Sequence, residues 1–380
     1  MNVISFARGV PGPDCLPVEE IGECTLAVLA REERDAPQYG PAAGFPPLRQ
    51  LLAERRGVEP QQVFVSNGSL QGLAFLWQHL LAGESKRVLV EAPTYDRPLK
   101  ILARLGADVE GIPMDEDGLE LDALEQALAG GPQPAFLYTI PTFQNPSGRT
   151  LSLERRRRLV ALAAERELLI VEDDPYGLVR FEGAPLPSLL ELAEPGRVVY
   201  SSSFSKTVAP GLRVGYLVLP PELAAAVEAI AVSTYVSPAI FTQAIVWEFL
   251  RRGLLERNVE RVSGLLRERR DAMIGALERD FPEGARWSDP RGGYFLWLDL
   301  PGGTSAAEFL AEAERRGVAF VAGADFYAGA GGESSARLAF SFASTADIRT
   351  GVGRLAGALD ALGSRLGSGR SVPPAPAPAV

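Results

Sequence analysis

The residue best suited to covalent chemistry in this sequence is Lys206, at the centre of the stretch SSSFSKTVAPGLRVGY at residues 201–216. The chain carries 38 basic residues, yet only three of them are lysines and all the others are arginines. A guanidinium stays charged at any working pH, whereas a lysine amine can lose its proton and form an imine with an aldehyde. A lysine placed between hydroxyls and small residues therefore indicates covalent chemistry at its amine.

We interpret Lys206 as the carrier of pyridoxal 5′-phosphate (PLP), held as a Schiff base, because the surrounding sequence offers a phosphate site. Phosphate binds well to backbone N–H groups at the N-terminus of a helix. Ser69 and Leu70 follow a glycine and open a predicted helix directly after a strand, although a simple helix cap explains this pattern as well. An arginine can bind phosphate through two parallel hydrogen bonds. The other candidate phosphate ligands are Ser203, Ser205 and Arg213.

The ring of this cofactor makes further demands that the sequence can meet. Its nitrogen must stay protonated for the ring to act as an electron sink, which calls for a buried carboxylate. The stretch VEDDPY at 171–176 ends a predicted strand with carboxylates. A solvated acidic loop or a metal site is the alternative, but further metal ligands are lacking nearby and we expect no metal. Tyr95 follows a strand end and can stack on the ring or lie in the core, while Asn145 and Tyr176 suit the ring oxygen.

An amino-acid substrate brings an α-carboxylate, which calls for an arginine on a rigid element. Arg337 begins a predicted strand at 336–342, and its alternative is an ordinary surface arginine. From these residues alone, Arg337 is a candidate for binding this carboxylate, and the two interpretations stay open.

The pattern of elements predicts an α/β fold with two lobes. Continuous apolar strands separated by helical patterns are typical of a mostly parallel sheet covered on both faces, and ligands bind at the carboxyl ends of its strands. Seven such strands are predicted, at 63–65, 87–91, 107–112, 135–140, 168–172, 197–202 and 213–219. Helices then dominate, with a long one at 254–280, and a smaller α+β unit follows. The expected division is an N-terminal segment of the small domain at 1–28, a large domain at 29–279, the small domain at 280–366 and a disordered tail at 367–380.

Composition and charge exclude several classes of protein. The net charge of −10 argues against nucleic acid as a partner. The chain has a single histidine, His79, which makes a histidine-based triad or a zinc site an unsuitable interpretation. We recognise no signal peptide and no apolar run of about 18 residues, so we expect no membrane span. Cys15 and Cys24 fit no metal or redox motif, and a reducing, cytoplasmic location fits them.

Taken together, these residues resemble a known family. The pattern Ser-Phe-Ser-Lys-(x)3-Pro-Gly-Leu-Arg-Val-Gly at 203–215, preceded by QNPSG at 144–148 and by Asp173-x-x-Tyr176, is similar to the class I/II aminotransferases, PLP enzymes of fold type I. The similarity runs from about residue 4 to residue 363. Further stretches near the N-terminus, around Tyr39 and at 320–323 resemble the bacterial α-aminoadipate and related broad-specificity aminotransferases.

The resemblance implies a role for each matching residue. Lys206 would be the Schiff-base lysine and proton carrier, Asp173 the partner of the ring nitrogen, and Tyr95 the stacking residue. Tyr176 and Asn145 would contact the ring oxygen, and Arg337, helped by Asn145, would take the α-carboxylate. Tyr39 would reach the phosphate of a neighbouring subunit, which implies a homodimer. The implied phosphate ligands are Ser69, Leu70, Ser203, Ser205 and Arg213.

The sequence departs from these relatives at the N-terminus. Arg8 stands where they usually carry glycine, and an arginine at the site entrance could bind a second carboxylate of the substrate or fill the pocket. The relatives also have a longer first segment, including a mobile helix that helps to recognise the substrate side chain, and we expect no counterpart of that helix here. The identity of the substrate therefore depends on residues outside the cofactor motifs.

The resemblance implies an aminotransferase that moves an amino group between an L-amino acid and a 2-oxo acid by a ping-pong route through the Lys206 imine. The alternative on the same site is elimination or replacement at the β or γ carbon, or cyclisation, as in an enzyme of specialised metabolism. A non-enzymatic regulatory descendant is the third hypothesis, but its expected mark is loss of the lysine or the aspartate, and both are present.

Overall fold

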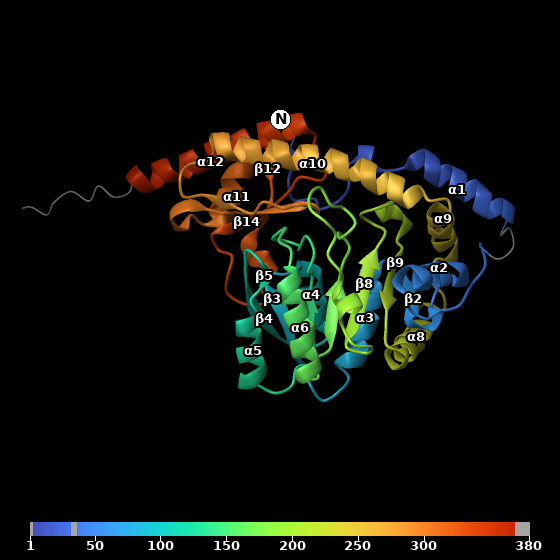
Figure 1. The fold of residues 1–380 in the computed structure, drawn as a ribbon. Helices are drawn as coiled ribbons and strands as arrows, with labels where there is room; N and C mark the ends of the chain where they lie inside the picture. The colour runs from blue at the N-terminus through green and yellow to red at the C-terminus, as the bar shows by residue number, and fades with distance from the viewer. Residues whose placement is uncertain (1–2, 32–35, 369–380) are drawn as a thin grey trace, which may run out of the picture.

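The computed structural model describes residues 3–31 and 36–368 of the 380-residue chain. A large sheet with helices on both of its faces forms one lobe, and a smaller sheet with its own helices forms the other (Figure 1). The long helix α10 (Leu254–Asp280) runs along the top of the molecule in Figure 1, past both lobes. Its bounds confirm the long helix predicted at 254–280.

The large sheet has the strand order β2-β9-β8-β7-β6-β3-β4-β5. The strands from β8 to β4 are parallel neighbours, while β9 runs antiparallel to both β2 and β8. Every position of β2, β6, β7 and β9 is buried, as expected for strands covered on both faces. The bounds are β2 Val63–Ser66, β3 Arg87–Ala92, β4 Asp108–Asp115, β5 Gly118–Leu119, β6 Phe136–Thr139, β7 Ile170–Asp173, β8 Val198–Ser203 and β9 Gly215–Val218.

The seven predicted strands are all present, and the mostly parallel sheet is confirmed. The eighth strand, β5, has only two residues and pairs antiparallel with the end of β4 through a tight turn. Gly118 adopts a φ of 95° there, which a side chain would disfavour. Two residues carry no periodicity, so the pattern of apolar residues could not reveal this strand.

Helices cover both faces of the sheet, and successive side chains of a strand pack against the helices on opposite faces. Val88 and Val90 pack with the α3 and α8 side of the core, whereas Leu89 packs with the α5, α6 and α7 side. The helix bounds are α1 Val18–Arg31, α2 Pro46–Arg56, α3 Ser69–Leu80, α4 Asp96–Arg104, α5 Leu121–Gly130, α6 Leu153–Glu165, α7 Leu189–Leu192, α8 Pro221–Tyr235 and α9 Ile240–Arg251. Short 3-10 helices lie at Pro13–Cys15, Pro60–Gln62, Pro210–Leu212, Pro301–Gly303 and Gly323–Phe326.

The small lobe contains an antiparallel sheet of order β10-β11-β14-β13. The predicted strand at 318–321 is two short strands in different sheets, because β12 pairs in parallel with β1 near the N-terminus while β13 pairs with β14. The bounds are β1 Ile4–Ser5, β10 Arg286–Trp287, β11 Phe295–Asp299, α11 Ala306–Arg315, β12 Val318–Ala319, β13 Val321–Ala322, β14 Ser335–Ala339 and α12 Thr345–Ser368. The division of the chain at residues 28, 279 and 366 stays a prediction, and most of the expected tail lies outside the described residues.

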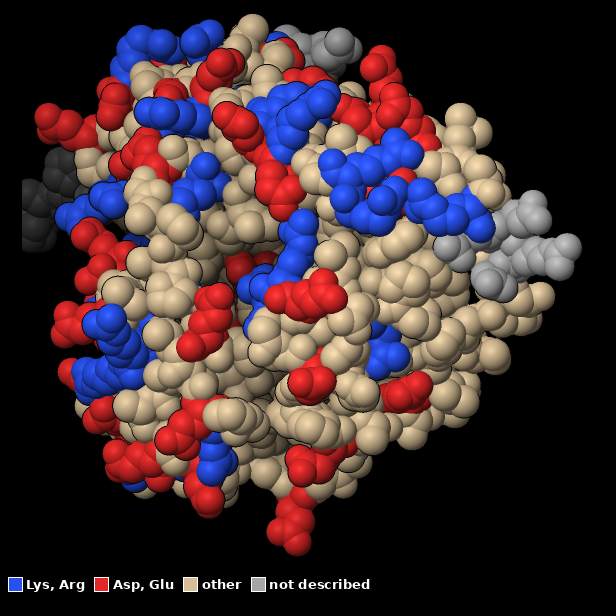
Figure 2. Space-filling model, turned by 45° about the vertical axis from the view of Figure 1, so that its right-hand side comes forward, with Lys and Arg blue, Asp and Glu red and all other residues tan. Residues whose placement is uncertain are grey.

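The surface carries charges of both signs. Figure 2 shows basic and acidic side chains interspersed over one face, which is hollowed near its centre. Among the helices of the described ranges, none is both long enough and apolar enough to cross a membrane.

Candidate active site

The predicted cofactor residues converge on one cavity of about 220 Å³ at the carboxyl ends of the central strands. Residues from β7, from the turn after β8, from the start of α3 and from the loop before α4 line this cavity. All of the predicted cofactor residues except Tyr39 belong to the lining: Ser69, Leu70, Tyr95, Asn145, Asp173, Tyr176, Ser203, Ser205, Lys206 and Arg213. A larger cavity of about 690 Å³ lies beside the 143–150 loop, but no lysine lines it.

Lys206 lies in the turn that follows β8, with its amine inside the cavity. The amine donates a hydrogen bond to the Gly9 carbonyl oxygen at 2.6 Å, and the Tyr294 hydroxyl donates to the Lys206 carbonyl at 2.9 Å. Burial, together with the nearby Arg337 and Arg213 charges, lowers the pKa of the Lys206 amine to about 8. A lysine with this pKa has a larger share of neutral, nucleophilic amine near pH 7 than an exposed lysine.

Asp173 ends β7 and is buried at the floor of the cavity. Its carboxylate accepts hydrogen bonds from the Tyr138 hydroxyl at 2.8 Å and from Ser201 Oγ at 2.9 Å. Burial raises the pKa of this carboxyl to about 6, although the two donors favour the charged form. A buried carboxylate of this kind is stabilised when a cation binds beside it, as a protonated ring nitrogen would.

The start of α3 and the residues after β8 contribute backbone amides and hydroxyls to the same cavity. Gly68 takes a φ of 89° just before the first residue of α3, and Arg213 also takes a left-handed conformation, with a φ of 52°. A Cβ on Gly215 would clash with the Ser69 amide, so glycine at that position keeps the start of α3 open. Ser203 Oγ donates to Ser205 Oγ at 3.0 Å inside the same cavity. The helix N-terminus, two hydroxyls and a guanidinium together suit a phosphate group.

Arg337 lies on β14, and its side chain is buried against two aromatic rings. Its Nη1 donates to Asn145 Oδ1 at 2.9 Å and its Nη2 donates to the Ala7 carbonyl at 2.8 Å. The guanidinium carbon is 4.4 Å from the ring centre of Phe295 and 4.9 Å from that of Phe326. Nε is buried and has no hydrogen-bond partner. A buried donor of this kind calls for an acceptor, which a bound carboxylate would provide.

Tyr95 and Tyr176 remain protonated at any working pH. Burial raises the pKa of Tyr95 to about 12 and shifts the pKa of Tyr176 upward further. Both phenols therefore keep a proton that they can donate to a ligand in the cavity, and the contact between Tyr176 and the ring oxygen stays a prediction.

The chain matches the family model described as aminotransferase class I and II over residues 2–355. The chain belongs to this family. It is a PLP-dependent aminotransferase of fold type I, so the predicted family, fold and cofactor are confirmed. The donor set of the cavity fits PLP, because a helix N-terminus with hydroxyls and a guanidinium, a buried carboxylate and a lysine all line it.

Individual relatives cover nearly the full chain. The 2-aminoadipate transaminase of Thermus thermophilus is 40% identical over 95% of this chain and 91% of its own length. An aromatic-amino-acid aminotransferase of Thermococcus litoralis is 37% identical over 93% of this chain and 87% of its own. The crystal structure of LysN, the α-aminoadipate aminotransferase of T. thermophilus, complexed with N-(5′-phosphopyridoxyl)-L-leucine, superposes with a TM-score of 0.91 at 39% identity and covers 96% of this chain and 93% of that one.

Two candidate residues lie outside the cavity of this aminotransferase. Arg8 is exposed, and its guanidinium carbon is 5.5 Å from the ring centre of Phe342. Tyr39 is 79% exposed and lines a separate surface hollow with Ser237 and Phe241. The structure therefore brings neither side chain to the cofactor cavity of its own chain.

Sequence reasoning missed the residues that hold the cavity residues in place. Tyr138 and Ser201 bind Asp173 because the strand register sets Val171 beside Tyr138 and Asp173 beside Ser201. Glu91, buried on β3, accepts from Gln144 Nε2 at 3.0 Å and from the Ile140 amide at 3.1 Å, so it fixes the loop that presents Asn145. An acidic residue inside an apolar strand was the one available signal for Glu91.

Proposed function

We propose that this enzyme moves amino groups between L-amino acids and 2-oxo acids. In this proposal Lys206 Nζ takes the proton from the substrate Cα and donates it again later in the same half-reaction. The bound cofactor supplies the electron sink that makes this proton removable. The observation that carries the proposal is the convergence of Lys206, Asp173 and the phosphate ligands on one cavity. The pKa of the Lys206 amine, about 8, is close to a working pH near 7, and such an amine can both accept and donate the proton.

Arg337 and Asn145 are proposed to bind the α-carboxylate of the substrate. The unpaired Nε of Arg337 supports this role, because Nη1 and Nη2 already have acceptors that hold the guanidinium plane. The named relatives act on 2-aminoadipate and on aromatic amino acids, so we propose broad specificity. We also propose that Arg8, one residue before Gly9, favours substrates with a second carboxylate at the entrance.

The test combines the PLP-loaded enzyme with single amino donors, namely L-2-aminoadipate, L-glutamate, L-phenylalanine and L-leucine. We expect the absorbance of the bound cofactor to change with donor alone, with one 2-oxo acid formed per site, and 2-oxoglutarate to restore it. Steady-state data should give parallel double-reciprocal lines. In Arg8→Gly, kcat/KM should fall for the two acidic donors only. Release of a leaving group without amino transfer would instead support elimination or replacement.

We propose that the enzyme works as a homodimer in which Tyr39 binds the phosphate of the partner's cofactor. The high exposure of Tyr39 supports a contact outside its own chain. Loss of one hydrogen bond to a charged group costs about 1.5–3 kcal/mol, so Tyr39→Phe should raise the Kd for PLP by about tenfold or more. Light scattering would measure the mass in solution.

Mixed dimers decide whether Tyr39 acts across the interface. A dimer of one Tyr39→Phe chain and one Lys206→Ala chain has one site with both residues intact, provided that the tyrosine comes from the other chain. We expect the tight PLP affinity to return in half of the sites of such mixed dimers. If both sites stayed weak, Tyr39 would act within its own chain.

We further propose a cytoplasmic location. Cys15 and Cys24 are both free and buried thiols, which suits a reducing compartment. Fractionation of the source cells followed by an activity assay would test this, and activity confined to an oxidising compartment would contradict it.

A further inference from the structure

The segment at residues 7–15, called the N-terminal strap below, passes directly over the active site. Its Ala7 carbonyl accepts from Arg337 Nη2 at 2.8 Å, and its Gly9 carbonyl accepts from Lys206 Nζ at 2.6 Å. Val10 lines the cofactor cavity. The strap therefore supplies backbone acceptors to both of the cations that the proposed function assigns to substrate and proton transfer.

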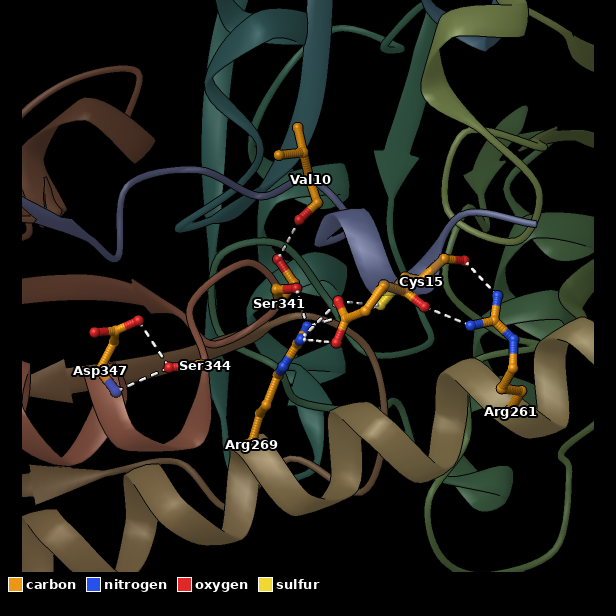
Figure 3. A network of polar contacts seen from close by, with 8 residues as sticks. Val10, Cys15, Arg261, Arg269, Ser341, Ser344 and Asp347 are labelled. Atoms are coloured by element: carbon orange, nitrogen blue, oxygen red, sulfur yellow. Dashed lines mark hydrogen bonds and ion pairs between the residues drawn. The ribbon is translucent and has the colours of Figure 1, made fainter. Parts of the chain in front are cut away.

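Arg269, near the middle of α10, anchors the strap from below (Figure 3). Its Nη2 donates to the two carboxylate oxygens of Asp14 at 2.8 and 2.6 Å, and its Nη1 donates to the Ser341 carbonyl at 2.7 Å. The Arg269 side chain is only 6% exposed, so its charge depends on Asp14 for compensation. The pair is thus a fixed contact and not a loose surface ion pair.

Ser341 links the same anchor to the part of the strap that covers the cavity. Its hydroxyl donates to the Val10 carbonyl at 2.8 Å, and its carbonyl accepts from the Gly12 amide at 3.1 Å. Arg269 and Gly12 thus share one acceptor. Arg261, two turns earlier on α10, donates to the carbonyls of Asp14 and Cys15 (Figure 3). These contacts leave the strap little freedom between residues 10 and 15.

We propose that Arg269 is a positioning residue of the reaction, acting through Asp14 and Ser341 to hold the strap carbonyls against Arg337 and Lys206. The inference rests on the proposed function of those two residues. Asn145 and Ala7 together fix the Arg337 guanidinium, and a shift of the strap removes one of these two acceptors. Catalysis is sensitive to such shifts, because a displacement of about 1 Å far from the reacting atoms can cost about 100-fold in rate.

The neighbouring Arg270 provides a matched control. Its side chain is 5% exposed and forms ion pairs with Glu182, Asp271 and Asp289, and its Nη1 donates to the Pro290 carbonyl at 2.7 Å. None of these partners belongs to the strap. Truncation of Arg270 therefore removes a buried arginine with at least as many contacts, and any general loss of stability should appear in both variants.

The test compares Arg269→Ala, Arg270→Ala and Asp14→Asn in the PLP-loaded enzyme, at a temperature where each variant is folded. In Arg269→Ala we expect kcat/KM to fall by roughly 10–100-fold, mainly through a higher KM for both donor and acceptor, because Arg337 binds the α-carboxylate of each. Asp14→Asn, which changes a half-exposed side chain and should fold, is expected to act in the same direction. Arg270→Ala should stay within about threefold of the wild type.

Amide hydrogen exchange gives a readout that does not depend on activity. In the peptide spanning residues 6–15 we expect Arg269→Ala and Asp14→Asn to speed exchange, most of all at Gly12, with and without PLP, while Arg270→Ala leaves it unchanged. Equal effects of Arg269→Ala and Arg270→Ala on KM and exchange, or an unchanged KM in folded Arg269→Ala, would overturn the inference. A wild-type enzyme that binds PLP without transferring amino groups would overturn the proposed function instead, and the exchange data would still decide whether Arg269 holds the strap.

Discussion

Replacement of Lys206 by alanine is expected to reduce amino transfer by roughly 10⁴-fold and to remove the yellow colour of the PLP-loaded protein. The physical reason is that Nζ has two proposed roles, as the covalent attachment point and as the group that carries the proton, and general acid–base catalysis alone contributes about 10²–10⁴-fold. Lys206 is also the one lysine in the lining of the cavity. Absorbance spectra and the rate of 2-oxo acid formation measure both effects.

Lys100 supplies the control for this experiment. It is an exposed lysine on α4 that pairs with Asp96 at 2.8 Å, so Lys100→Ala should retain colour and full activity. Lys206→Arg keeps the positive charge and should be as inactive as the alanine variant, because a guanidinium does not lose its proton. Retention of amino transfer within about tenfold of the wild type by either Lys206 variant would refute the assignment.

The sequence was most informative at positions where the proposed chemistry can be performed by only one or two residue types. Lys206, Asp173 and the glycine-opened helix at Ser69 follow strands whose apolar patterns are clear, and parallel strands bring their carboxyl ends to one edge of the sheet. The alternation of Val88, Leu89 and Val90 between two packed faces also follows from strand geometry. Local pattern, topology and the family resemblance therefore pointed to residues that line one cavity in the structure.

Residues that act through tertiary contacts were out of reach of the same reasoning. The Arg269–Asp14 pair joins positions 255 residues apart, and the bond from Tyr138 to Asp173 depends on the register of two strands. A local pattern shows neither the register nor the partner of a buried charge. Arg8 and Tyr39 show a second limit. An alignment with family members gives their positions in the sequence, but it does not show whether a side chain points into the cofactor cavity of its own chain.

Asp173→Asn should lower kcat/KM by about 10²–10³-fold, the usual cost of losing one preorganised electrostatic partner. The amide has nearly the shape of the carboxylate, so the variant removes the charge that is proposed to keep the ring nitrogen protonated while the fold persists.

Without PLP, the buried carboxyl of Asp173 has its pKa raised from 3.8 to about 6, so the folded state binds more protons than the unfolded state between these values. The contribution of Asp173 to stability therefore declines as the pH rises through this window, and Asp173→Asn should flatten that slope. Urea unfolding of the PLP-free protein between about pH 4 and pH 6 measures it.

Asp174 is the matched control for this charge. It is the next residue, and it accepts from the Tyr200 hydroxyl at 3.0 Å and from the Gly177 amide at 2.8 Å, but it does not line the cofactor cavity. Asp174→Asn should leave the cofactor spectrum unchanged and alter kcat/KM by less than about threefold, since neither Asp174 nor its partners Tyr200 and Gly177 line the cofactor cavity. If Asp174→Asn lowered activity as much as Asp173→Asn, activity would depend on the total negative charge at the end of the strand. A specific pairing of Asp173 with the ring nitrogen would then be refuted. If instead only Asp173→Asn changed the spectrum, the carboxylate with the Tyr138 and Ser201 donors would be the one that sets the charge of the cofactor.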